Sequence, residues 1–547
     1  MNGAQAIVSE LLRHGITSGF GIPSIHNIAL YDALRQAPQF NHWVVRHEQA
    51  AGFAADGFYR SSGKIAAVFA STGPGNLFTL VPLLESLQAN TPVLLLGTNI
   101  ASTLLNKTGG ALHETPDQIE ILRPLTRFAR RITRHGDIAE VITQAVEMFH
   151  GAMPGPAFIE IPHDLLLASI TVDSTEAKSP VRETQIFSSD KEIAEIRPRI
   201  AGSKNPVLLL GVGAKGARNA VGALAEELKC PVFTTTSGKG VFPGDHPLSA
   251  GCISRLGAVQ EICDQSDLLI SFGARLTEFD TGRFGLRLPA CHLQIVEDSH
   301  YAGDRIPSTL VVGNIGAIAE SLAQSATKRA AWCDLATIKQ REEHRVEALQ
   351  QESYAALKLL RSSMDRVDVL VNDQSILNYW VSAFFPVLEP NTFLYPYGSG
   401  TLGYGLPAAI GAACAIRQSG QRQKIICIAG DGGFQYTQHE LATLAQYQLP
   451  VKILLVNDNA YGVIGFLQRS MFGQMHEVAL RNPDFCRIAE AYGITAMTAT
   501  SLAELKEEMP EWLNVSGPAL LEWRTQLKAP WEVGAIPRPT GVAQKTS

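Results

Sequence analysis

Short apolar runs recur along the chain, and most of them end in glycine, serine or proline. They are apolar on both faces, which is typical of strands buried inside a parallel sheet. Amphipathic stretches such as residues 256–266 lie between them, so strands alternate with helices. This pattern predicts an α/β protein built from parallel sheets with helices on both faces. The runs are residues 64–71, 92–98, 156–162, 206–211, 267–273, 424–430 and 451–456.

Two polar stretches interrupt this alternation and divide the chain, whose 547 residues are too many for a single hydrophobic core. Residues 171–190 are rich in serine and threonine, and we expect a linker there. Residues 327–366 form a charged, helical stretch without strands. We therefore predict three domains, over residues 1–170, 190–326 and 367–530, followed by a tail that lies over a surface or is loose.

Composition restricts the class of protein. Charged residues make up 18% of the chain and hydrophobic residues 46%, and 46 basic against 52 acidic side chains leave a net charge of −6. This balance argues against nucleic acid or a membrane surface as the partner, and no apolar run reaches the roughly 18 residues of a membrane-spanning helix. The eight cysteines form no CxxC pair. We therefore expect reduced thiols and a cytoplasmic protein.

Two turns at strand ends carry the candidate chemistry. Residues 430–433, Gly-Asp-Gly-Gly, end one strand, and residues 457–462, Asn-Asp-Asn-Ala-Tyr-Gly, follow the next. One crossover helix fits between them, so the two strands are predicted to be parallel, with their carboxyl ends at the same edge of the sheet. Ligands bind beyond that edge in open parallel sheets.

The residues of these turns suit a metal and a phosphate. Asp431 and Asp458 bring two carboxylates together, and with the carbonyl of Ala460 they offer the oxygen ligands that Mg²⁺ prefers. Three glycines let the backbone approach a phosphate beside the N–H groups of a helix; they are Gly430, Gly432 and Gly433. Either turn alone is also compatible with a plain tight turn. The two at this spacing predict a metal-bridged diphosphate site.

These motifs resemble those of the thiamine diphosphate-dependent enzymes of the acetolactate synthase and 2-oxo acid decarboxylase superfamily. The two turns look like that family's metal–diphosphate motif, and residues 398–413, GSGTLGYGLPAAIGAA, look like the segment before it. The resemblance runs from about residue 3 to residue 527. It is also carried by residues 19–34, 46–60 and 71–81 in the N-terminal third and by residues 267–284 in the middle third.

The resemblance implies a fold, a cofactor and an assembly. It implies three Rossmann-like parallel-sheet domains: an N-terminal one that binds the aminopyrimidine, a central one, and a C-terminal one that binds the diphosphate. Thiamine diphosphate and Mg²⁺ would lie across a subunit interface, which implies a homodimer that shares its active sites and is often part of a homotetramer. The substrate would be a 2-oxo acid. Its decarboxylation would either release an aldehyde or ligate the remaining fragment to a second carbonyl.

The resemblance also implies roles for individual residues. Asp431, Asp458 and the carbonyl of Ala460 would hold Mg²⁺, and Leu402 would be the apolar wedge under the bent cofactor. Glu48 would face the aminopyrimidine and share a proton with its ring nitrogen. The other residues expected at the cofactor are Gly398, Ser399, Thr401, Gly430, Gly432, Gly433, Tyr461 and Gly462.

Two positions depart from the pattern of the family. Asp458 stands where asparagine is more common. It adds a negative charge beside the diphosphate, so the metal is needed more to offset the repulsion between them. His113 occupies the position of a glutamine near the reacting carbon in acetolactate synthases. A neutral imidazole there can donate a hydrogen bond to a carbonyl oxygen or shuttle a proton. The roles of His26 and His47 stay open.

Two further positions bear on the substrate. Ile25 stands where simple decarboxylases place a polar catalytic side chain, which disfavours a pyruvate or benzoylformate decarboxylase. Leu467 stands where biosynthetic acetolactate synthases usually have tryptophan, which predicts a pocket for longer 2-oxo acids. Residues 20–34 and 112–118 look closer to decarboxylases of larger 2-oxo acids, such as 5-guanidino-2-oxopentanoate.

The middle third contains a separate motif. Gly211, Gly213 and Gly216 have GxGxxG spacing between a strand and a helix, which would indicate an NAD-type oxidoreductase. A lone motif of this kind is weak, and no acidic residue clearly ends the second strand, where a ribose would need one. In the family that this chain resembles, central domains bind FAD, ADP or nothing. FAD is therefore an open alternative, although residues 252–257 do not match the usual FAD-binding segment.

Two other functions remain alternatives. One is an acetolactate synthase proper, which joins two pyruvate molecules. The other is a non-catalytic cofactor-binding or regulatory subunit, which is disfavoured because Glu48 and both carboxylate metal ligands are present together.

Overall fold

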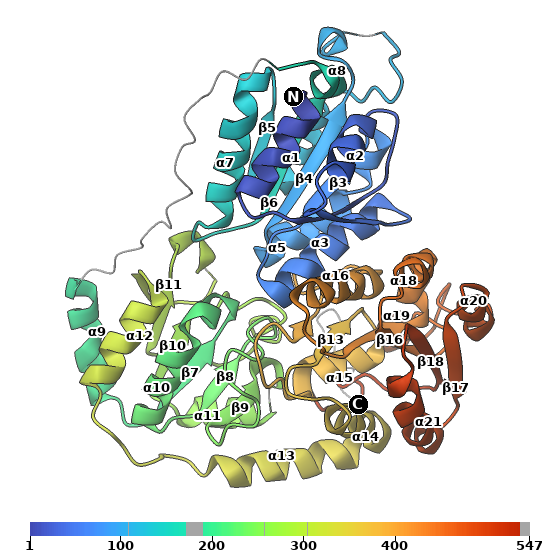
Figure 1. Ribbon diagram of the computed structural model, residues 1–547. Helices are drawn as coiled ribbons and strands as arrows, with labels where there is room; N and C mark the ends of the chain where they lie inside the picture. The colour runs from blue at the N-terminus through green and yellow to red at the C-terminus, as the bar shows by residue number, and fades with distance from the viewer. Residues whose placement is uncertain (108, 171–189, 256, 303–304, 537–547) are drawn as a thin grey trace.

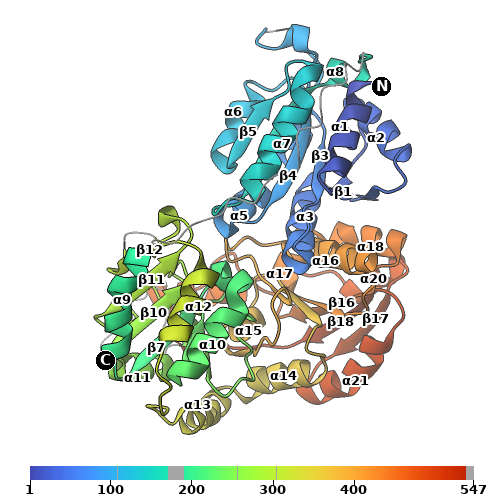
Figure 2. The same cartoon turned by 60° about the vertical axis from the view of Figure 1, so that its left-hand side comes forward.

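The computed structural model describes residues 1–107, 109–170, 190–255, 257–302 and 305–536. Three six-stranded sheets with helices on their faces make up this part of the chain (Figure 1, Figure 2). The predicted α/β class with three Rossmann-like domains is confirmed. The strands of each sheet lie within one predicted domain range, and the limits of the domains stay a prediction. Except for Asp190, the predicted linker lies outside the described residues.

The N-terminal sheet has the strand order β2-β1-β3-β4-β6-β5, with all pairings parallel. Its strands are β1 (Ser18–Gly21), β2 (Asn41–Val44), β3 (Ala67–Ala70), β4 (Val93–Asn99), β5 (Phe128–Arg131) and β6 (Pro156–Pro162). Its helices are α1 (Gly3–Arg13), α2 (Ile28–Arg35), α3 (Glu48–Ser62), α4 (Pro74–Leu77), α5 (Leu80–Ala89), α6 (Gln118–Leu122), α7 (Ile138–Phe149) and α8 (His163–Leu167).

The central sheet has the order β12-β11-β10-β7-β8-β9, also fully parallel. Counted within the domain from the β9 edge, this is 3-2-1-4-5-6, an order common in dinucleotide-binding folds. Its strands are β7 (Pro206–Leu210), β8 (Val232–Thr234), β9 (Ser249–Cys252), β10 (Leu268–Phe272), β11 (His292–Val296) and β12 (Thr309–Val312). Its helices are α9 (Asp190–Gly202), α10 (Arg218–Leu228), α11 (Gly257–Gln265) and α12 (Ile315–Ser325).

The C-terminal sheet has the order β14-β13-β15-β16-β18-β17 with parallel pairings. Its strands are β13 (Val369–Asn372), β14 (Phe393–Leu394), β15 (Ile425–Gly430), β16 (Val451–Asn457), β17 (Thr495–Ala499) and β18 (Ala519–Arg524). Its helices are α15 (Ile376–Phe384), α16 (Gly405–Ser419), α17 (Asp431–Phe434), α18 (Leu441–Tyr447), α19 (Gly462–Phe472), α20 (Phe485–Ala491) and α21 (Leu502–Asn514), and a short 3₁₀ helix, η7 (Gln438–Glu440), precedes α18.

The N-terminal and C-terminal sheets have the same strand order, so their loops correspond pairwise. The turn after the second strand is residues 45–47 in the first domain and residues 395–404 in the third. The segment between the third and fourth strands contains α5 in the first domain and η7 with α18 in the third. This correspondence places related turns of the two domains in comparable positions.

The two outer domains pack through α3 and α16, which lie against each other in both ribbon views (Figure 1, Figure 2). Glycines permit the close approach of these helices: a Cβ on Gly57 would lie 2.2 Å from the carbonyl oxygen of Ala408, and one on Gly411 would lie 1.9 Å from that of Ala54. One apolar core runs across this interface, with Phe53 of α3 beside residues of α16. The interface is therefore part of the core.

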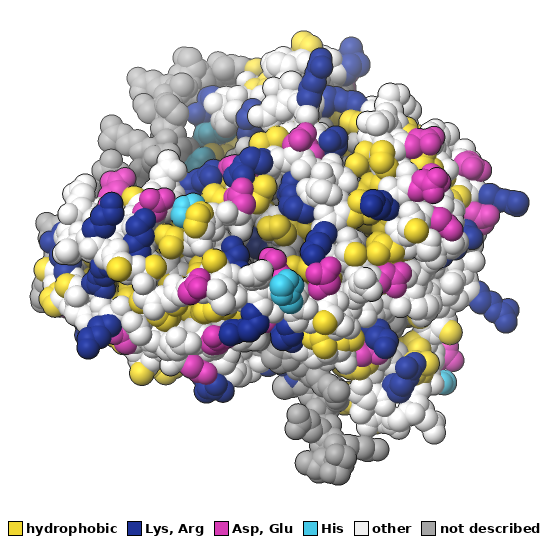
Figure 3. All heavy atoms as spheres, turned by 90° about the horizontal axis from the view of Figure 1, so that it is seen from below, with side chains coloured by type: hydrophobic (Ala, Val, Ile, Leu, Met, Phe, Trp, Pro, Cys, Tyr) yellow, Lys and Arg dark blue, Asp and Glu magenta, His cyan; other side chains and the backbone are white. Residues whose placement is uncertain are grey.

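The charged stretch predicted at residues 327–366 contains two helices, α13 (Leu335–Leu349) and α14 (Gln351–Ser362), which run along the base of the central and C-terminal domains (Figure 2). The start of the tail is packed, since Trp531 and Ala535 are buried. On the face seen in Figure 3, basic and acidic side chains are interspersed. No helix among the described residues is both long and apolar enough to cross a membrane.

Candidate functional site

The two acidic turns meet at the carboxyl edge of the C-terminal sheet, as predicted. β15 and β16 are neighbours in parallel register, with Gly430 opposite Val456, so Asp431 and Asp458 follow at the same edge. A cavity of about 220 Å³ opens there. It is lined by the turn at residues 430–433, Asp458, residues 460–462 and Leu402. Gly462 is needed for this packing, because a Cβ there would lie 2.3 Å from a carboxylate oxygen of Asp458.

The two carboxyl groups face each other closely enough to share a proton. Burial, followed by the charge and hydrogen bond of Asp431, raises the pKa of Asp458 to about 7. Burial also raises the pKa of Asp431. A buried carboxylate beside a half-buried one is repelled by it unless a proton or a cation lies between them. This donor set fits a hard divalent cation such as Mg²⁺.

Asn482 completes this edge and was not predicted. Its side-chain amide donates to Asp431 at 2.5 Å and to the side-chain oxygen of Asn457 at 2.9 Å. Gln435 in turn donates to the side-chain oxygen of Asn482 at 3.0 Å. Asn482 lies in the loop between α19 and α20, far along the chain from the two turns. No motif marks it, so only the folded structure identifies it.

If the carboxylates hold a metal, they must first lose their shared proton, so metal binding has a defined pH dependence. Below pH 7 the proton occupies the site, and above pH 7 the site is free for the cation. We expect the apparent affinity for Mg²⁺, measured by titration with thiamine diphosphate in excess, to be roughly tenfold weaker at pH 6 than at pH 8. An affinity unchanged between these pH values would contradict a metal site at this pair.

The loop at residues 398–405 forms one side of the cavity. A methyl carbon of Leu402 lies 3.5 Å from where a Cβ on Gly433 would be, so Leu402 packs toward the glycine-rich turn. The buried carboxylate of Asp373 accepts from the backbone N–H groups of Gly403 at 3.1 Å and Gly405 at 2.8 Å. Burial raises the pKa of Asp373 to about 6. Gly398 and Ser399 line a larger cavity at the central domain instead, and Thr401 lines neither cavity.

Glu48 is the first residue of α3, at the carboxyl edge of the N-terminal sheet. The side chain of His47 caps the helix by accepting from the N–H of Gln49 at 3.1 Å, which gives His47 a structural role. Glu48 is half-buried, and one of its carboxylate oxygens lies 3.2 Å from where a Cβ on Gly75 would be. Its carboxylate therefore lies beside the start of α4, the short helix that follows β3.

His113 lies beside Gly73, the residue that precedes α4. Its carbonyl oxygen is 2.4 Å from where a Cβ on Gly73 would be, and its φ of +64° is rare for a residue with a side chain. The ring of His26 lies 5.2 Å from the rings of both His113 and His163. Burial, then the neighbouring His163 and His113, lowers the pKa of His26. The three imidazoles thus gather at the edge that also presents Glu48.

The glycines of the central GxGxxG motif have a packing role. A Cβ on Gly211 would lie 2.1 Å from the carbonyl oxygen of Gly273, and one on Gly213 would lie 2.9 Å from its Cα. These glycines let the turn after β7 pack against the end of β10. The larger cavity, of about 720 Å³, lies nearby between all three domains, and Arg275 and Arg283 are among its lining residues.

The predicted site residues thus fall into two half-sites. The metal half, in the C-terminal domain, contains Asp431, Asp458 and Leu402, and every described residue that lines its cavity comes from that domain. The other half contains Glu48 and His113 at the edge of the N-terminal sheet. Neither of these residues lines the metal-half cavity. The catalytic and binding roles of all these residues stay predictions.

Comparison with protein families finds three matches in order along the chain. The description "Thiamine pyrophosphate enzyme, N-terminal TPP binding domain" matches residues 1–121. The central domain of the same group matches residues 193–322, and its C-terminal TPP binding domain matches residues 373–523. Together the matches cover parts of all three sheets.

Comparison with individual proteins gives full-length relatives. The chain is 33% identical over 539 residues to "Probable 2-ketoarginine decarboxylase AruI" of Pseudomonas aeruginosa, covering 96% of this chain and 94% of that protein. It is 29% identical over 536 residues to the acetolactate synthase isozyme 1 large subunit of Escherichia coli K12, covering 95% and 93%. The structure of the Rhodococcus jostii RHA1 thiamine diphosphate-dependent 4-hydroxybenzoylformate decarboxylase matches with a TM-score of 0.83 at 21% identity, covering 96% of this chain and all of that one. The last match shows a shared fold.

Proposed function

Since the chain belongs to the thiamine pyrophosphate enzyme family, we propose that it binds thiamine diphosphate and Mg²⁺ and decarboxylates a 2-oxo acid. The observation that carries this proposal is the facing pair Asp431 and Asp458 beside a cavity lined by a glycine-rich turn. Such a pair suits a cation that bridges to a diphosphate. A non-catalytic subunit is disfavoured because Glu48 is also presented at the edge of its sheet.

Each half-site would have its own task. Thiamine diphosphate supplies the reactive carbon and the electron acceptor that allow a 2-oxo acid to lose CO₂. Asp431, Asp458 and the carbonyl of Ala460 would hold Mg²⁺, and Leu402 would support the cofactor from below. Glu48 would hold a proton at the ring nitrogen of the aminopyrimidine. His113 would donate a hydrogen bond to the carbonyl oxygen of the substrate.

We propose a homodimer in which the N-terminal half-site of one subunit faces the metal half of the other. The separation of the half-sites within one chain supports this arrangement. Large apolar side chains are also exposed in the segments beside both half-sites, on and next to α2, α5, α17 and α19: Ile28, Phe78, Val81, Tyr436, Ile464 and Phe472. Exposed apolar surface of this kind is typical of subunit interfaces. Two such dimers would form the proposed homotetramer.

We propose a cytoplasmic location, because all eight cysteines are unpaired.

The proposed substrate is a 2-oxo acid of five or more carbons, with 5-guanidino-2-oxopentanoate the first to test. The similarity to the protein named as a 2-ketoarginine decarboxylase supports this choice. Leu467 lies on α19, one turn beyond Val463 and Ile464, which line the metal-half cavity. Leucine leaves more room there than tryptophan would. Release of an aldehyde is the proposed outcome, with acetolactate formation from pyruvate as the alternative.

A panel of 2-oxo acids tests this assignment through CO₂ release and product identity. We expect the highest kcat/KM for an acid of five or more carbons, because one or two additional buried methylenes contribute roughly 1–3 kcal/mol. Leu467→Trp should lower kcat/KM for that acid about tenfold or more relative to pyruvate, whereas Leu467→Ile should not. A preference for pyruvate with acetolactate as the product would assign the protein as an acetolactate synthase.

FAD in the central domain is the alternative left open for the larger cavity. The volume of about 720 Å³ admits a ligand of some size, and Arg275 in the lining can pair with an anionic group, whereas Arg283 is already paired with Glu278 of the same lining. The packing role of Gly211 and Gly213 argues against a phosphate at the GxGxxG turn. The absorption spectrum of the purified protein tests this alternative: a flavin band would show bound FAD, and a spectrum without that band would exclude FAD in the purified protein.

A further inference from the structure

Two buried glutamates cross the interface between the outer domains in opposite directions. Glu85 of α5 accepts from the backbone N–H groups of Gly398 at 3.0 Å and Ser399 at 2.6 Å, and from the Ser399 hydroxyl at 2.8 Å. Glu440 of η7 accepts from the N–H groups of Arg46 at 2.8 Å and His47 at 3.1 Å. Neither glutamate side chain is exposed. Each thus holds two consecutive peptide groups of the other domain.

The two contacts are equivalent under the shared topology of the domains. Glu85 lies between the third and fourth strands of its sheet, and Glu440 lies between the third and fourth strands of the other. Each receives N–H groups from the turn that follows the second strand of the opposite domain. The arrangement is therefore reciprocal, and not a single chance contact. We call the two contacts the Glu85 clasp and the Glu440 clasp.

Each clasped turn leads directly to a residue predicted to contact the cofactor. The Glu440 clasp fixes the two residues before Glu48, and the Glu85 clasp fixes a turn three residues before Leu402. Asp373 holds that same loop on its far side, through Gly403 and Gly405. The loop that carries Leu402 is thus fixed between one carboxylate from each domain.

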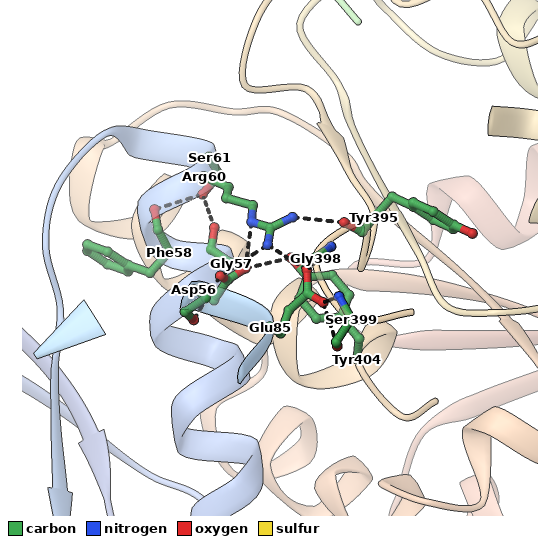
Figure 4. A network of polar contacts seen from close by, with 11 residues as sticks. Asp56, Gly57, Phe58, Arg60, Ser61, Glu85, Tyr395, Gly398, Ser399 and Tyr404 are labelled. Carbon is green, nitrogen blue, oxygen red and sulfur yellow. Dashed lines mark hydrogen bonds and ion pairs between the residues drawn. The ribbon is translucent and has the colours of Figure 1, made fainter. Parts of the chain in front are cut away.

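The Glu85 clasp is held in place by a buried charge network, shown in Figure 4. Arg60 of α3 pairs with Glu85 at 2.9 Å and with Asp56 at 2.7 Å, and donates to the carbonyl oxygen of Tyr395 at 2.8 Å. The Tyr404 hydroxyl donates to Asp56 at 2.8 Å. One cation thus serves two buried carboxylates, so neither carboxylate can move without leaving a buried charge unpaired.

The Glu440 clasp is oriented by a hydroxyl. Thr443 donates to the second carboxylate oxygen of Glu440 at 2.5 Å, while both backbone N–H groups go to the first oxygen. The ring of His47 packs against Phe78 at 4.5 Å, which fixes the turn from its other side. The turn before Glu48 is therefore held by the C-terminal domain as well as by its own.

We propose that Glu85 and Glu440 are positioning residues that set the two half-sites of the cofactor: Glu85 sets the Leu402 loop, which binds the cofactor, and Glu440 sets Glu48, which activates it. This inference rests on the proposed function. A role in domain packing alone predicts the same loss of stability for both glutamates and no separate effect on binding or activation. A positioning role predicts that the two effects separate.

The test measures three quantities in the full-length protein with Mg²⁺: the melting temperature, the Kd for thiamine diphosphate, and the rate at which the C2 proton of the bound cofactor exchanges with deuterium. Glu85→Gln should raise the Kd about tenfold or more and leave the exchange rate at saturation within about threefold of wild type. Glu440→Ala should slow the exchange about tenfold or more and leave the Kd within about threefold. Glu440→Gln keeps the oxygen that accepts both N–H groups, so its exchange rate should stay close to that of the wild type.

Two further variants keep the test decisive. Glu342→Ala removes another buried glutamate, which is bonded to Arg345 in α13 away from both half-sites, and should change only the melting temperature. Thr443→Val loosens Glu440 without removing it and should slow the exchange severalfold even if Glu440→Ala does not fold. Equal changes of Kd and exchange in the Glu85 and Glu440 variants, or changes no larger than in Glu342→Ala, would overturn the positioning role. If the wild-type protein itself bound no thiamine diphosphate, the proposed function would fail first.

Discussion

Asp431→Ala is expected to lose thiamine diphosphate on gel filtration, whereas the wild-type protein retains it. The substitution removes an anionic oxygen that would bridge through Mg²⁺ to the diphosphate. It also removes one of the two acceptors of the Asn482 amide, the one at 2.5 Å, and leaves only Asn457. We expect the Kd for the cofactor to rise by about two orders of magnitude or more, the scale of a lost metal ligand or its supporting shell. Direct titration in the presence of Mg²⁺ measures this.

Asp458→Asn is the matched control for this prediction. The amide oxygen of asparagine can take the place of the carboxylate as a metal ligand, and asparagine is the more common residue here in the family. The variant also removes the carboxyl group whose pKa is raised to about 7 by burial and by the neighbouring Asp431. We therefore expect activity to be largely retained and the pH dependence of Mg²⁺ binding to weaken. Wild-type retention of the cofactor by Asp431→Ala would refute the metal site.

The difference between the two acidic turns and the rest of the site shows what the sequence can predict. Asp431 and Asp458 each end an apolar run, and neighbouring parallel strands necessarily bring their carboxyl ends together. Periodicity and turn chemistry therefore suffice for this pair, and the register of β15 and β16 confirms it. The same argument identified the buried strands β3, β4, β6, β7 and β10.

Contacts between distant segments lie beyond such patterns. Glu85 and Glu440 each look like a glutamate in a helical segment, and nothing nearby in the sequence indicates that either is fully buried. Their burial follows from domain packing, in which α3 and α16 approach closely. Ser399 is predicted at the cofactor, and the structure shows its hydroxyl bonded to Glu85. Sequence order alone does not give the direction of a side chain in a loop.

Edge strands were missed for a different reason. β17 is exposed or half-buried for most of its length, and β14 has only two residues. Such strands lack the continuous apolar run that marks a buried parallel strand. The GxGxxG spacing has a different limit, since Gly211 and Gly213 satisfy a packing requirement against Gly273. A spacing motif does not distinguish close approach of a ligand from close approach of backbone.

Glu48→Gln is expected to lower kcat about 10²-fold or more while the cofactor still binds. Glu48 begins α3, half-buried, with one carboxylate oxygen beside Gly75 of α4. Glutamine keeps the size and can still form a hydrogen bond to the ring nitrogen of the aminopyrimidine, but it has no proton to share there. The alternative is a glutamate that only favours the start of a helix through its charge. In that case glutamine would cost a few tenths of a kcal/mol of stability and leave the chemistry unchanged.

The rate of C2 proton exchange in the bound cofactor separates these two roles, because it reports activation before any substrate is present. With the cofactor at saturation, Glu48→Gln should slow this exchange in parallel with kcat, and Glu48→Asp should slow it less, since the acid remains but lies one methylene farther away. Glu440→Ala should resemble Glu48→Asp, because it displaces the carboxylate without removing it. An unchanged exchange rate in Glu48→Gln would exclude Glu48 from activation. The Glu440 clasp would then have no catalytic group to position, and the contact would be reduced to domain packing.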